Sequence, residues 1–292
     1  MKVKKAVILA AGLGTRMLPA TKSVPKELFP IVDKPALQYL VEEVKASGID
    51  EIMIIISRGK TLIEDHFDYA PELEDRLKRG GPAKEAALRQ VREIAEMADI
   101  VYARQKETLG TGHALRLARN FVGNDPFAVL YGDDVIINEE KPVVGQLCEI
   151  YEKYGKSVVG VQEVSEELVM KYCTLDVSKI SDSLYEVSDM IEKPKKEEII
   201  SRFSVLGRII LTPDVFDYLD KTPYAKNGEL QLTDTMKLIS NDGKMMALDF
   251  DGIRYDMGSK LGVMQAQVET ALKHPEIGDE FREYLKNLAQ TL

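Results

Sequence analysis

The sequence has 292 residues, of which 45% are hydrophobic and 30% are charged, and its formal net charge is −9. This composition is typical of a globular protein and excludes a disordered or fibrous chain. An acidic chain also lacks the basic excess that nucleic-acid binding requires, so no nucleic-acid partner is expected. Two cysteines are too few for a disulfide framework, and three scattered histidines lack the spacing of a zinc site.

The first residues resemble a signal peptide only superficially. Three lysines precede an apolar run over residues 6–11, but Gly12 and Gly14 interrupt this run at once. A secretory signal has a longer apolar core, and no other run approaches the roughly 20 residues of a membrane span. We therefore expect a cytoplasmic protein with no membrane partner.

Predicted strands and helices alternate in the first part of the chain. Apolar runs predict strands over residues 6–11, 51–57, 100–104, 127–131 and 157–163. Helical spacing of apolar residues predicts helices over residues 35–47, 82–98, 112–121 and 143–154. This alternation predicts an α/β fold with an open, mostly parallel, Rossmann-like sheet.

From about residue 172 the pattern changes. Short strand-like segments over residues 174–177, 185–191 and 205–211 predict a small β-rich insertion over one edge of the sheet. Helices follow over residues 213–219 and 232–240, and then over residues 262–272 and 280–292. We treat residues 1–292 as one domain with three parts: a core over about 1–165, a β-rich part over about 166–258, and C-terminal helices over about 259–292.

A glycine loop, Gly-Leu-Gly-Thr-Arg over residues 12–16, follows the first predicted strand. This is where an open α/β sheet binds its ligand, and glycines let backbone amides surround phosphate oxygens. Lys22 and Lys26 add positive charge nearby, which favours anion binding over a plain turn. Met17 replaces the third glycine of a dinucleotide fingerprint and argues against an NAD-dependent oxidoreductase, and no Gly-Lys-Ser/Thr follows as in a P-loop.

The run from Ala10 to Lys26 resembles the signature of the sugar-nucleotide pyrophosphorylases. Within that family it is most similar to bacterial uridylyltransferases that act on UTP and glucose 1-phosphate. The resemblance extends over nearly the whole chain. Further matching segments are residues 33–35, 104–107, 109–114, 192–194, 228–234 and 255–262.

The resemblance implies a magnesium-dependent enzyme that converts UTP and glucose 1-phosphate into UDP-glucose and pyrophosphate by direct in-line attack. It implies that the core binds the nucleotide, that the β-rich part binds the sugar, and that the protein is a homodimer or homotetramer. Two alternatives stay open. One is the same chemistry with another sugar 1-phosphate or with dTTP, and the other is a non-catalytic sugar-nucleotide-binding paralogue.

The resemblance also implies roles for individual residues. The catalytic residues are expected to be Arg16, Lys26 and Lys193. The nucleotide contacts are expected from Ala10, Ala11, Gly12, Gly14, Thr15, Glu27, Gln105 and Gly110. The sugar contacts are expected from Cys173, Glu192, Lys193 and Gly207. His113 is interpreted as structural.

Paired acids follow the predicted strand over residues 127–131. Asp133 and Asp134 can hold a magnesium ion together with substrate phosphates, but a polar turn explains them equally well. The resemblance favours a metal ligand here, and favours Asp133 over Asp134. Asp256 is a second candidate ligand, although a cap for the helix that begins near Ser259 is an equal interpretation.

One position departs from the family. The sequence reads Tyr-Cys-Thr-Leu over residues 172–175, where the family has a glycine in place of Cys173. That glycine lies against the sugar in the family. We therefore expect the Cys173 side chain to narrow or re-aim the hexose pocket.

Overall fold

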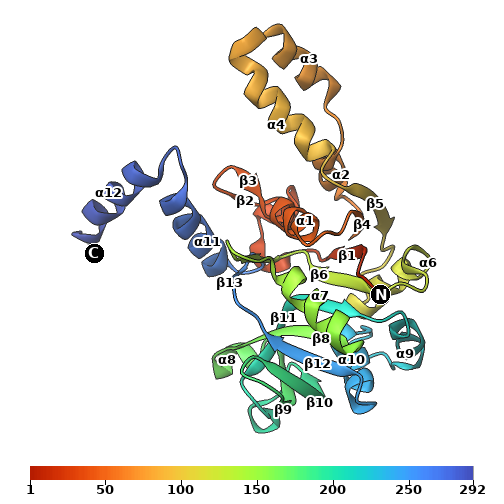
Figure 1. Ribbon diagram of the computed structural model, residues 1–292. Coiled ribbons are helices and arrows are strands. Elements are labelled where there is room, and N and C mark those ends of the chain that lie inside the picture. The colour runs from red at the N-terminus through yellow and green to blue at the C-terminus, as the bar shows by residue number, and fades with distance from the viewer. Residues whose placement is uncertain (292) are drawn as a thin grey trace.

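The computed structural model describes residues 1–291 and is built around one nine-stranded sheet (Figure 1). Its strands occur in the order β5-β4-β1-β6-β11-β8-β12-β10-β9. Their bounds are β1 (Lys5–Ala10), β4 (Glu51–Ile56), β5 (Asp99–Arg104), β6 (Phe127–Tyr131), β8 (Ser157–Glu163), β9 (Cys173–Lys179), β10 (Leu184–Glu192), β11 (Phe203–Leu211) and β12 (Met245–Asp249). Two small ribbons pair β2 (Pro30–Ile31) with β3 (Lys34–Pro35) and β7 (Asp134–Ile137) with β13 (Ile253–Asp256).

The helices lie on both faces of this sheet and on two projections. Their bounds are α1 (Ala36–Ala46), α2 (Thr61–Phe67), α3 (Pro71–Arg79), α4 (Glu85–Ala95), α5 (Thr111–Leu115), α6 (Arg119–Val122), α7 (Val143–Tyr154), α8 (Glu166–Val169), α9 (Val215–Lys221), α10 (Leu232–Asn241), α11 (Lys260–Lys273) and α12 (Gly278–Ala289). Among residues 1–291, no helix has the length and apolar character needed to cross a bilayer.

The sheet is covered on both faces, as the continuous apolar runs of its strands predict. Successive residues of β1 point to opposite sides, so Val7 and Ile8 belong to different apolar clusters. The Ile8 cluster includes α1 and α7, and the Val7 cluster includes α5, α9 and α10. The predicted α/β architecture with a mostly parallel sheet is confirmed by the parallel pairs β5–β4, β4–β1, β1–β6 and β8–β12.

The position of β11 differs from the sequence prediction. We expected residues 205–211 to belong to an insertion over one edge, but β11 lies between β6 and β8 and pairs antiparallel with both. All nine of its residues are buried, as in a central strand. Only β9 and β10 extend the sheet at its far edge, through β12, which the sequence analysis did not predict. The β-rich part is therefore continuous with the central sheet.

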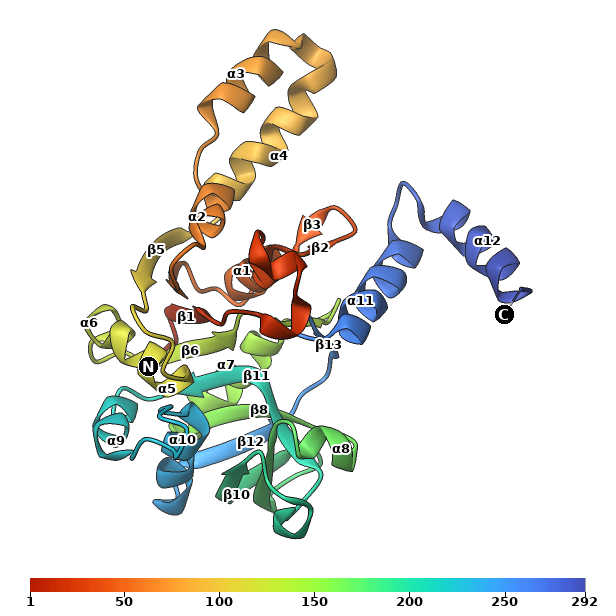
Figure 2. The ribbon, with the colours of Figure 1, turned by 180° about the vertical axis from the view of Figure 1, so that it is seen from behind.

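Two helical segments project from the body of the molecule. Figure 2 shows the α3–α4 hairpin and the α11–α12 pair extending away from the sheet. The predicted helix over residues 82–98 is realised as α4, while α2 and α3 were not predicted. The single helix expected over residues 112–121 is wrong, because a 3₁₀ turn at Arg116–Ala118 separates α5 from α6.

Candidate active site

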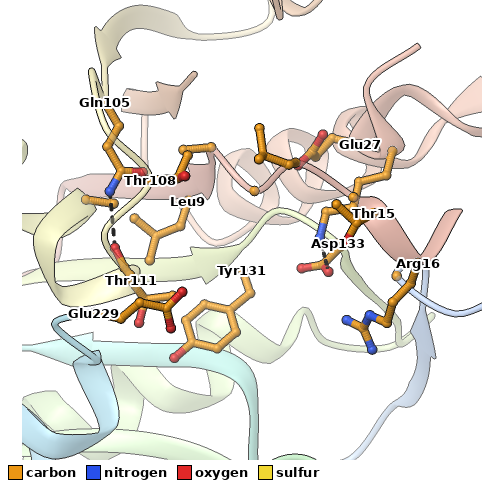
Figure 3. A pocket seen from close by; sticks show the side chains of 18 of the residues that line it. Leu9, Thr15, Arg16, Glu27, Gln105, Thr108, Thr111, Tyr131, Asp133 and Glu229 are labelled. Carbon is orange, nitrogen blue, oxygen red and sulfur yellow. Dashed lines mark hydrogen bonds and ion pairs between the residues drawn. The ribbon is translucent and has the colours of Figure 1, made fainter. Parts of the chain in front are cut away.

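A cleft of about 550 Å³ opens at the carboxyl ends of β1 and β6 (Figure 3). This is the edge where an open α/β sheet binds its ligand. A smaller cavity of about 150 Å³ adjoins it. Both cavities are lined by Arg16, Thr111, Tyr131, Asp133 and Gln231. The two cavities therefore form one site with a large and a small compartment.

The large compartment is lined by most of the predicted nucleotide contacts. Those that line it are Ala11, Gly12, Gly14, Thr15, Glu27, Gln105 and Gly110, and the predicted catalytic residues Arg16, Lys26 and Lys193 line it as well. Ala10 does not line it, because β1 ends there and its carbonyl accepts a hydrogen bond from Lys60 Nζ at 2.6 Å. The predicted residues are thus brought together from four separate segments of the chain.

Lys26 and Asp133 form an ion pair inside the large compartment, and Figure 3 shows Asp133 near Arg16. Burial works to lower the pKa of Lys26, but the carboxylates of Asp133 and Glu27 raise it above its ordinary value. Burial works to raise the pKa of Asp133, but Lys26 and Arg16 bring it below its ordinary value. Both groups are therefore charged around neutral pH, and both face the cleft.

A second ion pair lies at the wall of the large compartment and involves Glu27 and Lys60, and Lys60 was not predicted from the sequence. Lys60 Nζ donates to both carboxylate oxygens of Glu27, each at 2.8 Å, and both residues are buried. Burial raises the pKa of Glu27 and lowers the pKa of Lys60, against their mutual attraction. Glu27 is thus held by Lys60, and its predicted contact with the nucleotide stays a prediction. Lys60 follows β4 at the carboxyl edge of the sheet, and this position could have indicated that it is a site residue.

Gln105 lies at the opposite end of the large compartment from Arg16 (Figure 3). Its amide nitrogen donates to the Gly110 carbonyl at 3.2 Å and contacts His113 Nδ1 at 2.9 Å. The structural interpretation of His113 fits this contact, which orients the Gln105 amide. Gly110 has a φ of 96°, and a Cβ on it would lie 2.5 Å from the Leu230 carbonyl oxygen. Only glycine fits there.

The small compartment contains two of the predicted sugar contacts, Cys173 and Glu192. They are direct neighbours across the β9–β10 pair. Cys173 Sγ accepts a hydrogen bond from the Val205 amide at 3.3 Å, and burial raises the thiol pKa to about 12. Burial also raises the pKa of Glu192. A neutral thiol and a half-buried carboxyl group thus line the small compartment side by side.

Lys193 follows Glu192 directly and lines the large compartment instead. Its φ is 45°, which is uncommon for a residue other than glycine. Its backbone amide donates to the Tyr172 carbonyl at 2.8 Å. This backbone turn sends Glu192 and Lys193 into adjacent compartments.

Gly207 is not among the residues that line either compartment. It has a φ of 71°, and a Cβ on it would lie 2.5 Å from Asp134 Oδ2. Gly207 therefore packs directly behind Asp134, and its predicted sugar contact stays a prediction. Its neighbour Arg208 is fully buried and forms an ion pair with Glu43 on α1 at 2.7 Å.

The candidate metal ligands gather where β7 pairs with β13, because Asp134 and Asp256 are register partners. Asp134 Oδ1 accepts from Arg254 Nε at 2.8 Å. Burial raises the Asp134 pKa to about 6 even though Arg254 opposes this shift. Asp133 is the acid of this pair that lines both compartments, and Asp134 lines only the smaller one. This placement favours Asp133 as the ligand.

Gly258 lies between Asp133 and Asp256, where there is no room for a side chain. A Cβ on Gly258 would lie 2.8 Å from Asp133 Oδ2, 3.0 Å from Asp256 Oδ1 and 3.1 Å from Arg16 Nη2. No group of three or more His, Cys, Asp or Glu side chains arranged for a metal occurs among residues 1–291. Two carboxylates beside the cleft fit the way magnesium binds with substrate phosphates as its other ligands. Asp256 Oδ1 also accepts from the Gly258 amide at 2.8 Å, so it closes this turn as well. The helix cap itself comes from Ser259.

Comparison with known proteins agrees with the fold and the site. A family profile described as "Nucleotidyl transferase" matches residues 5–286. The chain belongs to this family, which confirms the resemblance seen in the sequence.

The individual relatives are more specific. The chain is 47% identical to a UTP–glucose-1-phosphate uridylyltransferase of Staphylococcus haemolyticus, over 98% of this chain and 99% of the relative. It is similar to a UDP-glucose pyrophosphorylase solved with UDP-glucose, with a TM-score of 0.85, 40% identity, and coverage of 93% of this chain and 100% of the other. It is also similar to the UTP-bound enzyme of Acinetobacter baumannii, with a TM-score of 0.90, 33% identity, and coverage of 98% and 99%.

Proposed function

We propose that this protein transfers the uridylyl group of UTP to glucose 1-phosphate and releases pyrophosphate. The observation that carries the proposal is the joined pair of compartments. The larger is lined by the glycine loop, Arg16 and Lys26, and the smaller by Glu192 and Cys173. The relatives named above, which carry this activity in their names, support the same assignment.

Gln105 is proposed to recognise the base. Both of its contacts use the amide nitrogen, and within the described residues its carbonyl oxygen has no hydrogen-bond partner. That oxygen can accept a hydrogen bond from N3–H of uracil. Cytosine has no hydrogen at N3, so its lone pair would face the same oxygen. This geometry favours a uridine nucleotide over a cytidine nucleotide.

The positive charges are proposed to bring two polyanions together. Arg16 and Lys26 line the large compartment with the glycine-loop amides and suit the triphosphate, while Lys193 suits the phosphate of the sugar. A phosphate oxygen of glucose 1-phosphate is already an anion, so its attack on the α-phosphorus needs no general base. The protein's contribution is orientation and charge stabilisation. The P–O bond to the β-phosphate breaks as the new bond forms, and pyrophosphate leaves.

Asp133 and Asp256 are proposed to hold Mg²⁺, because both line the small compartment and their carboxylates lie on either side of Gly258. Bound there, Mg²⁺ would neutralise phosphate charge as it develops. We also propose a cytoplasmic location, in keeping with two free cysteines of which one lies in the site. The homodimer or homotetramer that the resemblance implies stays a prediction.

The test is pyrophosphate release by purified protein with Mg²⁺, across a grid of nucleoside triphosphates and sugar 1-phosphates. We expect the fastest turnover with UTP and glucose 1-phosphate. Preference for dTTP or another sugar 1-phosphate would keep the chemistry and correct the specificity. Absence of turnover with every pair would overturn the proposal in favour of a sugar-nucleotide-binding protein.

A further inference from the structure

Tyr172 contacts both halves of the site from a single position between α8 and β9. Its backbone carbonyl accepts the Lys193 amide at 2.8 Å. Its hydroxyl group donates to Asp256 Oδ2 at 3.1 Å. The proposed sugar-phosphate lysine and the second proposed metal ligand are therefore held by the same residue.

The Tyr172 ring is itself fixed by Arg254. The guanidinium carbon lies 4.7 Å from the ring centroid, and Nη1 donates to the tyrosine hydroxyl oxygen at 3.1 Å. Arg254 in turn contacts Asp134, which is buried. A cation stacked on the ring and bonded to its hydroxyl restricts that hydroxyl to one direction. The single proton of this hydroxyl group then points to Asp256 Oδ2.

Asp256 uses its two oxygens differently. Oδ2 accepts from Tyr172, whereas Oδ1 accepts from the Gly258 amide at 2.8 Å and lies beside Gly258, as Asp133 Oδ2 does. If the Tyr172 bond is removed, the carboxylate keeps only the bond within its own turn and is free to rotate about χ2. The orientation of the Asp256 carboxylate relative to Asp133 is then no longer fixed.

We propose that Tyr172 is a positioning residue, whose hydroxyl orients Asp256 for metal binding while its backbone fixes Lys193. This inference rests on the proposed function, because it takes Asp256 as a ligand and Lys193 as the sugar-phosphate contact. Groups that orient a metal ligand in this way typically change metal affinity by about 10–100-fold when they are removed.

The test is Tyr172→Phe, which removes only the hydroxyl and keeps the ring, the Arg254 stack and the backbone carbonyl. Tyr185→Phe is the matched control, because the Tyr185 hydroxyl on β10 makes only a 3.5 Å contact with the Asp182 carbonyl. The Mn²⁺ affinity of each protein, with UDP-glucose bound, is measured by electron paramagnetic resonance. The Mg²⁺ dependence of turnover and the KM for glucose 1-phosphate are measured alongside.

We expect Tyr172→Phe to weaken Mn²⁺ binding about 10-fold and to raise the half-saturating Mg²⁺ concentration similarly. The KM for glucose 1-phosphate should change less than about 2-fold, because the Lys193 contact is to the backbone; Tyr185→Phe should match the wild type. In Asp256→Ala, adding Tyr172→Phe should cause no further loss, because the two residues act as a unit.

Unchanged Mn²⁺ affinity in Tyr172→Phe would overturn the inference. Equal losses in metal affinity and in sugar-phosphate KM would also overturn it, since they indicate general loosening of the site. The Mn²⁺ measurement needs no turnover, so failure of the proposed function in the substrate grid remains distinguishable from failure of this inference.

Discussion

Two ion pairs in this molecule differ in their exposure to solvent, and the difference indicates that one is structural and the other functional. Arg208 and Glu43 meet between β11 and α1, where the Arg208 side chain is 0% exposed and the Glu43 side chain 7%. Lys26 and Asp133 meet at the carboxyl edge, where their side chains are 12% and 22% exposed and both line the cleft. One pair is closed to solvent and the other is open to a ligand.

The closed pair has little capacity left for a ligand. Arg208 Nε and Nη2 donate to Glu43, and Nη1 donates to the Asp134 and Gly207 carbonyls at 2.9 and 3.3 Å. Glu43 Oε1 also accepts from the Val144 amide at 3.0 Å. A fully satisfied buried pair contributes to the packing of α1, α7 and β11. The open pair instead keeps charge available at the cleft. The difference predicts that substitutions at the two pairs act on different quantities.

The largest effect is expected for Asp133→Asn. The amide keeps the volume but removes the charge from the cleft, so kcat at saturating Mg²⁺ should fall about 10³-fold, or about 4 kcal/mol. The free energy of unfolding, measured by urea titration, should stay within about 1 kcal/mol of the wild type. Asp125→Asn is the control, since Asp125 pairs with Lys5 at 2.9 Å and does not line the cleft. Full activity of Asp133→Asn would remove Asp133 from the site chemistry.

A smaller effect, on the free energy of unfolding rather than on turnover, is expected for Arg208→Met. The change leaves the Glu43 carboxylate buried without its cation, which should lower the free energy of unfolding by about 3 kcal/mol. Turnover of the folded fraction should stay within about 3-fold of the wild type. Adding Glu43→Gln removes the stranded charge and keeps an acceptor for Val144, so it should restore part of the stability. A selective loss of kcat with unchanged unfolding would show that the closed pair is functional.

Gly258→Ala tests the packing around Asp133 in the open pair. The new Cβ would meet Asp133 Oδ2, Asp256 Oδ1 and Arg16 Nη2 at 2.8–3.1 Å, all of them ends of side chains rather than backbone. These groups can move aside, so stability should change by less than about 1 kcal/mol, while kcat/KM should fall about 30-fold, or about 2 kcal/mol. Gly145→Ala on α7 is the control, since its Cβ would meet nothing closer than 3.5 Å. Equal activity of both variants would contradict a role for the close approach of Asp133 and Asp256 at Gly258.

The smallest effect is expected for Cys173→Gly. The thiol accepts a hydrogen bond from the Val205 amide and lines the small compartment. Its removal therefore enlarges this compartment and leaves the Val205 amide free to face a ligand. We expect the ratio of kcat/KM values for glucose 1-phosphate and a second hexose 1-phosphate to shift about 5-fold, or about 1 kcal/mol. An unchanged ratio across several hexose 1-phosphates would show that Cys173 does not set sugar preference.

The sequence predicted the local elements where the apolar pattern is strong. Strands β6 and β8 and helix α7 were predicted with the bounds that the structure has. Strand β11 was placed wrongly because membership of a central sheet depends on distant pairing partners, such as Ile209 with Val129 on β6. Periodicity contains no information on such pairing.

The same limit applies to the site. The glycine loop, Lys26 and Asp133 stand out because motif and position act together in the sequence. Tyr172 and Arg254 were missed as site residues, because they meet across 82 residues and nothing in the sequence links the two segments. Lys60 was missed because its partner Glu27 is 33 residues away. Contacts of this kind arise only when the fold brings separate segments together.

The claim that the uridylyl group passes in one step from UTP to glucose 1-phosphate is tested most directly by the exchange of labelled pyrophosphate into UTP. With Mg²⁺ and both UTP and glucose 1-phosphate present, exchange should be readily detected, because the reaction runs in both directions through UDP-glucose. Without glucose 1-phosphate, exchange should be absent, because no residue forms a covalent uridylyl intermediate. Exchange with UTP alone, or no exchange with the complete mixture, would contradict the account.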